Sequence, residues 1–93
     1  MVSSNEITHL VCDEYITTVF LIDGNKITIS RLLKCFEEEL KPFGFIRPNR
    51  CTLVNAYHID KVSTVERKRY IHIGDFTIPV SRRKIGILGN IMK

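Results

Sequence analysis

The sequence predicts a mainly β domain of short strands, with one helix between two hairpins and a short C-terminal helix as accessories. Short apolar runs bounded by turn signals recur along the chain, and two Gly/Asp pairs separate such runs at hairpin spacing. Only two stretches show helical periodicity. The 93 residues suffice for one core, so residues 1–93 are expected to form a single domain.

Two β-hairpins are predicted. In the first, YITTVFLI (15–22) and NKITI (25–29) flank Asp23-Gly24, a pair suited to a two-residue type I′ turn. In the second, RYIHI (69–73) and FTIPV (76–80) flank Gly74-Asp75. Pro79 cannot donate a ladder hydrogen bond, so the last strand is expected to lie at a sheet edge or to end near Pro79.

A helix is predicted between the hairpins, over residues 31–41. Ser30 is the expected N-cap, and Pro42 with Gly44 ends the helix. Its apolar stripe comprises Leu32, Leu33, Phe36 and Leu40.

The other segments are short extended pieces over residues 43–48, 51–55 and 58–65, with a basic turn at 65–69. Ser81 is a candidate cap for the short C-terminal helix, residues 82–93.

Composition indicates a soluble chain without catalysis. Apolar residues at 44% and charged residues at 26% are typical of globular proteins, and no apolar run is long enough to span a bilayer. With no signal pattern, a cytoplasmic location is expected. Three scattered cysteines without a CxxC pair predict reduced thiols and neither metal nor cofactor, with Cys12 and Cys35 as apolar packing groups. Cys51 and His58 would lack the third group of a catalytic triad.

Charge is unevenly distributed. Residues 1–40 hold seven acidic and three basic residues, a net −4, whereas residues 41–93 hold three acidic and eleven basic residues, a net +8. A basic half of this kind suggests a polyanionic partner.

The basic residues cluster at the joints between predicted elements, around Arg47–Arg50, 67–69 and 82–84, and more weakly at Lys61. Loops present side chains to partners, and the arginine fork suits phosphates and the O6/N7 edge of guanine. The alternative is that these arginines are ordinary solvated surface residues without a binding role. Taken together, the clusters favour neither interpretation over the other.

Four motifs occur in the order and spacing of a known family. They are DEYITTVFLIDGNKI (13–27), SRLLKCFEEEL (30–40), FGFIRPNRCTLVNAYHIDKV (43–62) and FTIPVSRRK (76–84). From about Ile7 to Met92 the chain resembles the LytTR DNA-binding domain, the output domain of bacterial response regulators in two-component systems. The resemblance implies an elongated arrangement of short antiparallel strands in three small sheets, with a helix packed at the side. It also implies loops, rather than a recognition helix, that enter two successive major grooves of promoter DNA and so regulate transcription.

The resemblance also assigns contacts. Base contacts are expected from Arg50 and Arg83, and from Tyr15 and Ile16 in the first loop; Ile16 could meet only a thymine methyl group. Candidates for phosphate contacts are Arg47, Asn49, Cys51, Arg69, Ser81, Arg82 and Lys84. Asn55 is interpreted as structural, with its amide tying a turn to neighbouring backbone.

Two departures from the family pattern bear on base preference. Cys51 stands where serine is frequent, and Asn49 stands where histidine is frequent. Family members bind paired imperfect repeats and follow a receiver domain, so the chain is expected to be an excised C-terminal fragment that is monomeric alone and paired on double-stranded DNA. The rival functions are a β-rich module whose basic loops bind an acidic protein, and a nonspecific or RNA-binding module.

Overall fold

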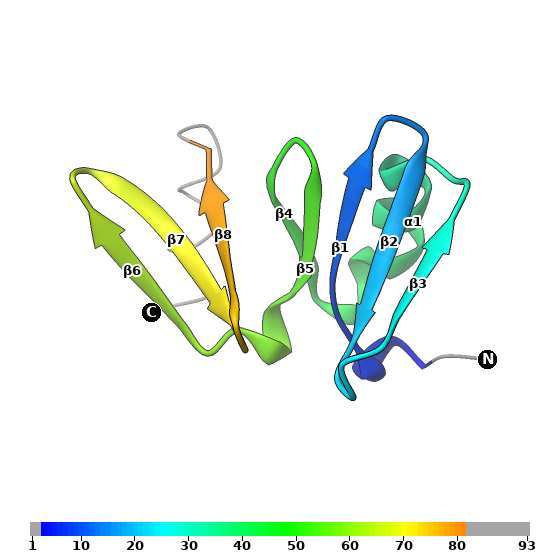
Figure 1. Cartoon of the computed structure of the whole chain (residues 1–93), viewed down its shortest axis with the longest axis horizontal. Coiled ribbons are helices and arrows are strands. Elements are labelled where there is room, and N and C mark those ends of the chain that lie inside the picture. Colours follow the sequence, from blue (N-terminus) through cyan, green and yellow to red (C-terminus); the bar gives the residue numbers. More distant parts are fainter. Residues whose placement is uncertain (1–2, 82–93) are drawn as a thin grey trace.

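The computed structural model describes residues 3–81, and within them eight strands form two antiparallel sheets (Figure 1). The five-stranded sheet has the order β3-β2-β1-β5-β4, and the three-stranded sheet has the order β6-β7-β8. The strands are β1 (Ile7–Asp13), β2 (Ile16–Leu21), β3 (Lys26–Ile29), β4 (Phe45–Asn49), β5 (Thr52–Asn55), β6 (Lys61–Val65), β7 (Lys68–Ile73) and β8 (Phe76–Val80). The mainly β class is confirmed, and extents of 37 × 25 × 24 Å make the molecule elongated. The expected C-terminal helix over 82–93 lies outside the described residues.

Two sheets replace the three that the family resemblance implied. β1 pairs with β2 along one edge. Along its other edge it pairs with β5, through His9, Leu10 and Val11. At seven residues, β1 is long enough to serve both partners, so the first hairpin and the β4–β5 hairpin join in one sheet.

Both predicted hairpins are present, but the first turn differs from the type I′ expectation. Gly24 N–H donates to the carbonyl of Leu21, and Leu21 N–H donates to the carbonyl of Asn25, which gives a three-residue loop. Only Gly24 has a positive φ, 91°, whereas a type I′ turn needs two such residues. Between β7 and β8, Gly74 has φ 55° at the first position of a two-residue turn, as in type II′. Pro79 lies in edge strand β8, as predicted.

Helix α1 (Leu33–Leu40) begins later than predicted. Ser30 is not its N-cap; Leu32 holds that position with an extended backbone and no side-chain cap. Leu33 and Phe36 are buried, but Leu32 is half exposed because it precedes the helix. The helix continues into the 3₁₀ turn η2 (Lys41–Phe43), which ends at Gly44 with φ 86°. Two further 3₁₀ turns are η1 (Ser4–Glu6) and η3 (Ala56–His58). Within residues 3–81, no helix has the length and apolarity to cross a membrane.

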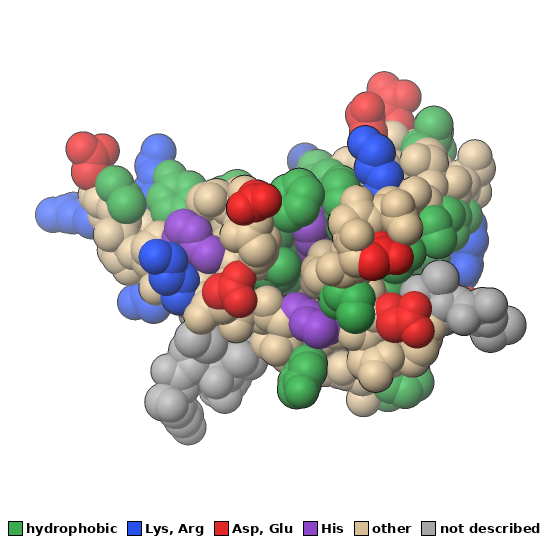
Figure 2. All heavy atoms as spheres, turned by 60° about the horizontal axis from the view of Figure 1, so that its bottom comes forward, with side chains coloured by type: hydrophobic (Ala, Val, Ile, Leu, Met, Phe, Trp, Pro, Cys, Tyr) green, Lys and Arg blue, Asp and Glu red, His purple; other side chains and the backbone are tan. Residues whose placement is uncertain are grey.

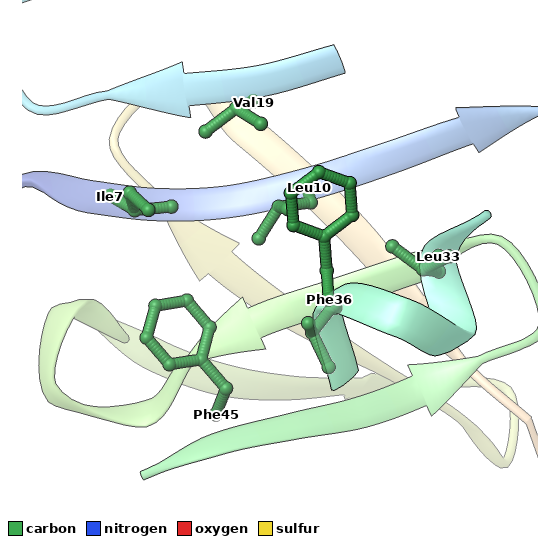
Figure 3. Packing of buried hydrophobic residues seen from close by; sticks show 7 residues of the cluster. Ile7, Leu10, Val19, Leu33, Phe36 and Phe45 are labelled. Carbon is green, nitrogen blue, oxygen red and sulfur yellow. The ribbon is translucent and has the colours of Figure 1, made fainter. Parts of the chain in front are cut away.

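One core lies between the five-stranded sheet and α1 (Figure 3). Phe36 and Leu33 point from the helix toward β1 and β5, where Leu10 and Leu53 are fully buried. The full set is Ile7, Leu10, Val19, Leu33, Phe36, Phe45 and Leu53. Cys12 packs against this cluster as predicted, whereas Cys35 is exposed and is not a packing group.

A second core lies on the opposite face of β5 and joins the two sheets. Its buried members are Val54, Ile71, Ile73, Ile78 and Val80. Adjacent residues of a strand point to opposite faces, so Leu53 enters the first core and Val54 the second. All four residues of β5 are therefore buried.

Asn55, at the end of β5, is structural as predicted. Its side chain is 2% exposed and donates to the carbonyl of Ile7 at 3.0 Å. Its side-chain oxygen accepts from Tyr57 N–H at 3.1 Å, which fixes the start of η3. The amide thus connects β1, β5 and η3.

His9 lies among aromatic rings between the two sheets. Its ring stacks on Phe20 at a centroid distance of 4.4 Å and meets Phe76 at 4.6 Å. Thr8 Oγ1 is 2.8 Å from its Nδ1. Burial of the ring lowers the pKa of His9 from 6.5 to about 4.

Acid should therefore destabilise the fold through His9. Between pH 6.5 and 4 the unfolded chain binds a proton at His9 that the folded chain does not, so the free energy of unfolding falls as pH falls through this range. The loss is at most about 3 kcal/mol. Urea unfolding across this pH range measures it. His9→Phe keeps an aromatic ring and should flatten the dependence; equal pH dependence in both proteins would contradict the assignment.

Candidate nucleic-acid interface

Four connections lie along one side of the molecule, here named the upper edge (Figure 1). They are the β1–β2 turn Glu14–Tyr15, the β4–β5 turn Arg50–Cys51, the β6–β7 turn Glu66–Arg67, and Ser81 after β8. Strands β1, β4, β6 and β8 all run toward this side, so the segments that follow them lie along it. The lower edge carries the β2–β3 and β7–β8 turns with η2 and η3.

Backbone conformation differs between the two edges. The glycines with positive φ, Gly24, Gly44 and Gly74, all lie in lower-edge connections. Among the described residues, positive φ without glycine occurs only at Glu14 (57°), Glu66 (50°) and Arg67 (69°), all in upper-edge turns. A side chain in this region costs about 1–2 kcal/mol relative to ordinary backbone. Keeping side chains there at such a cost is typical of functional surfaces.

Hydrogen bonds to three of its backbone atoms hold the β4–β5 turn in place. Arg47 donates through Nη2 to the carbonyl of Arg50 at 2.7 Å, and Asn49 Oδ1 accepts from Cys51 N–H at 2.9 Å. On the β1 side, Cys12 N–H donates to the carbonyl of Cys51 at 2.8 Å. The backbone that carries Arg50 is thus fixed from β4 and from β1.

The Arg50 side chain is exposed and makes no hydrogen bond or ion pair with any residue in 3–81. Arg47, in contrast, forms an ion pair with Glu37 of α1 at 3.0 Å and is only 23% exposed. The backbone of Arg50 is thus fixed, while its exposed guanidinium bonds to no residue in 3–81.

Asn49 also uses both ends of its amide inside the protein. Besides its bond to Cys51, it donates through Nδ2 to the carbonyl of Pro79 at 2.7 Å. Ser81 N–H donates to the carbonyl of Pro48 at 2.9 Å. These two bonds join the ends of β4 and β8, so the β4–β5 turn and Ser81 are held side by side although they come from different sheets.

The β1–β2 turn presents Tyr15 and Ile16, which are 74% and 46% exposed. Ile16 pairs with Asp13 and begins β2, so its position follows from the ladder. Both residues lie on the upper edge with Arg50, as the resemblance implied.

The β6–β7 hairpin forms a basic end of the molecule. Seen from the lower edge, Lys and Arg side chains gather over this end, while acidic side chains lie over the middle (Figure 2). Arg69 is exposed in β7, opposite Val80. A hollow of about 270 Å³ lies between this hairpin and β8, lined in part by Arg67, Arg69 and Pro79.

The predicted site residues fall into three groups. Tyr15, Ile16, Arg50, Cys51 and Ser81 lie together on the upper edge, and Arg69 lies on β7 beside it. Arg47 and Asn49 support the β4–β5 turn from within. Arg82, Arg83 and Lys84 lie outside the described residues. His58 is in η3 on the lower edge, bonded to the carbonyl of Asn5 at 2.7 Å, so it is not beside Cys51.

Arg67 is a further basic residue of the upper edge that the family motifs do not single out. One feature of the sequence marks Arg67: the two-residue hairpin turn Glu66–Arg67 contains neither glycine nor asparagine, the residues that such turns prefer. Such a turn keeps two charged side chains at positive φ, and only the pairing of Val65 with Lys68 identified the residues involved.

Comparison with known proteins agrees with this geometry. The family described as the LytTr DNA-binding domain matches residues 1–93. The chain belongs to this LytTR family. The solved LytTr DNA-binding domain of a Bacillus cereus protein described as a methyl-accepting/DNA response regulator superposes with a TM-score of 0.83 at 22% identity. The match covers 98% of this chain and 84% of that one. No curated protein matches.

Membership of the LytTR family makes this chain a DNA-binding domain rather than a member of an enzyme family. The likeness to the solved domain establishes the LytTr fold. In this LytTR domain the upper edge carries the exposed Arg50, with turns of positive φ on either side of it.

Asn49 is expected to stabilise the whole fold as well as to hold the β4–β5 turn. Asn49→Ala removes bonds to Cys51 and Pro79 and should lower the free energy of unfolding by about 1–3 kcal/mol. Chemical denaturation measures the change. Asn25→Ala is the matched control, because the Asn25 amide bonds only to exposed Asp23; it should stay within about 0.5 kcal/mol. Equal losses in both variants would contradict the linking role of Asn49.

Proposed function

We propose that this LytTR domain binds duplex DNA sequence-specifically at promoter repeats and so regulates transcription. Upper-edge turns enter successive major grooves; Arg50 reads a base, and Arg83 is its counterpart after β8. The observation that carries the proposal is the Arg50–Cys51 turn, whose backbone is bonded at 2.7–2.9 Å while the exposed guanidinium bonds to no residue in 3–81.

The dimensions support contact with two grooves. The four upper-edge connections are spread along the longest axis, which spans 37 Å. Successive major grooves on one side of B-DNA are about 34–36 Å apart. The β1–β2 turn and the β6–β7 hairpin can therefore lie a large part of one helical turn apart, with Arg50 between them.

The remaining predicted residues divide by what holds them. Tyr15 is free to approach a base and Ile16 a thymine methyl group. Arg69, Ser81, Arg82 and Lys84 are assigned to phosphates, and Cys51 contributes through its backbone position. Arg47 and Asn49 are positioning residues first, because their polar groups already bond to Glu37, Arg50, Cys51 and Pro79.

The pairing of domains is also proposed. One domain occupies each imperfect repeat, and an upstream receiver domain in the full-length cytoplasmic protein supplies the second tether. The isolated domain is then a monomer that binds half-sites weakly, because tethering raises the effective concentration of the second domain.

Selection of duplexes from a random pool with residues 1–93 tests the function. Enrichment of a shared motif, with weak binding to single strands of the same sequence, supports it. Enrichment of no duplex, together with capture of an acidic protein, would replace it with the protein-interaction alternative.

Arg50→Ala and Arg83→Ala should each lose roughly 1–3 kcal/mol of binding free energy on the selected duplex and much less on random duplex. The reason is the loss of a paired contact with one base. Lys26→Ala is the control, because β3 begins with Lys26 at the lower edge. Fluorescence anisotropy measures all three. Equal losses on selected and random DNA would make the arginines phosphate contacts only.

Arg67 should add a phosphate contact at the basic end. The double change Glu66→Asn and Arg67→Gly supplies the residues that a type I′ turn prefers, so thermal stability should rise while the slope of log affinity against log salt falls by about 1. Lys61→Ala, at the lower-edge start of β6, is the control and should leave the slope unchanged. An unchanged slope in the double variant would remove Arg67 from the interface.

A further inference from the structure

Cys12 and Cys51 are brought face to face by the pairing of β1 with β5. The ladder pairs His9 with Val54, Leu10 with Leu53 and Val11 with Thr52, so Cys12 and Cys51 are the next opposed pair. The bond from Cys12 N–H to the carbonyl of Cys51, at 2.8 Å, continues the ladder to this position. These residues are 39 positions apart in sequence, and only the sheet joins them.

Opposed residues of an antiparallel pair point to the same face of the sheet. Of the two bonds that a hydrogen-bonded pair exchanges, Cys12 N–H makes one, while Cys51 N–H donates to Asn49 Oδ1 instead. Opposed residues of antiparallel strands have Cα atoms about 4.5–5.5 Å apart, within the span of a disulfide, about 4.4–6.8 Å. Cys12 is partly buried against the first core, while Cys51 is exposed at the upper edge. Burial raises the pKa of the Cys12 thiol, and the neighbouring Cys51 thiol raises it further. The Arg47 guanidinium acts in the opposite direction and favours a thiolate.

We propose that Cys12 and Cys51 form a redox-active dithiol that low-molecular-weight disulfides of the glutathione class oxidise to an intramolecular disulfide. The Cys51 thiolate attacks one sulfur of the small disulfide, forms a mixed disulfide and releases one small thiolate. The Cys12 thiolate then attacks Cys51 Sγ, closes the protein disulfide and releases the second small thiolate. The two protons of the protein thiols end on the two released thiols, and the small disulfide takes up the two electrons.

The position of the pair gives the bond a consequence for DNA. Cys51 follows Arg50, and Cys12 lies two residues before Glu14 in the β1–β2 turn. A disulfide requires Cβ atoms about 3.8 Å apart, closer than they are in most opposed strand pairs. Closing it displaces the Arg50–Cys51 turn relative to Arg47 and Asn49, which hold it. This part rests on the proposed function and predicts that oxidation weakens binding to selected duplex.

The cross-link is tested without DNA. Reduced residues 1–93 are incubated with oxidised glutathione, and intact mass with peptide mapping follows the products. The expected product has lost two hydrogens and links Cys12 to Cys51. Cys35→Ser should give the same product, because Cys35 is exposed on α1 and is the matched control thiol. Cys12→Ala should stop at the glutathione adduct of Cys51.

The outcomes separate clearly. A wild-type protein that accumulates only mixed disulfides, or that links Cys35 instead, overturns the dithiol. If the link forms, the affinity of the oxidised protein for the selected duplex should fall roughly tenfold, comparable to the loss of one base contact. Dithiothreitol should restore it, and Cys51→Ser should show no change on oxidation. Unchanged affinity overturns the regulatory part alone. A reduced protein that binds no duplex would refute the proposed function and leave the cross-link result standing.

Discussion

Burial of both faces of β5 is the constraint on which the remaining structure depends. Leu53 faces α1 and Val54 faces the three-stranded sheet, and both are fully buried. A strand exposed on either face would leave one of the two cores without its centre. Asn55 closes the same strand with bonds to β1 and η3, so the register of β5 is fixed by apolar contacts along it and by polar contacts at its end.

That register has a direct effect on the upper edge. The β4–β5 turn ends where β5 begins, so any slip of β5 would move Arg50 and break the bond between Cys12 and Cys51. The bonds from β4 to β8 extend the same control to the second sheet. Packing of the interior therefore determines where the side chains of these turns lie at the surface.

The two edges of the molecule use different turn chemistry. The lower edge obtains positive φ from glycine, which carries no steric penalty, and its turns serve to close the fold. The upper edge places Glu14, Glu66 and Arg67 in the same region of backbone space, where a side chain is unfavourable. Function can select charged side chains at such positions when the flanking strands supply enough stability to hold them.

The sequence by itself determined the class of fold, both glycine-containing hairpins, the edge position of Pro79 and the structural role of Asn55. These follow from local chemistry: alternating apolar residues, turn pairs and motif spacing. Tertiary structure decided what depends on contacts distant in the chain. It joined two hairpins through β1, shifted the start of α1, and committed Arg47 and Asn49 to Glu37 and Pro79. It also brought Cys12 to Cys51. Pairing between separate strands sets these neighbours, and no short window of sequence contains both partners.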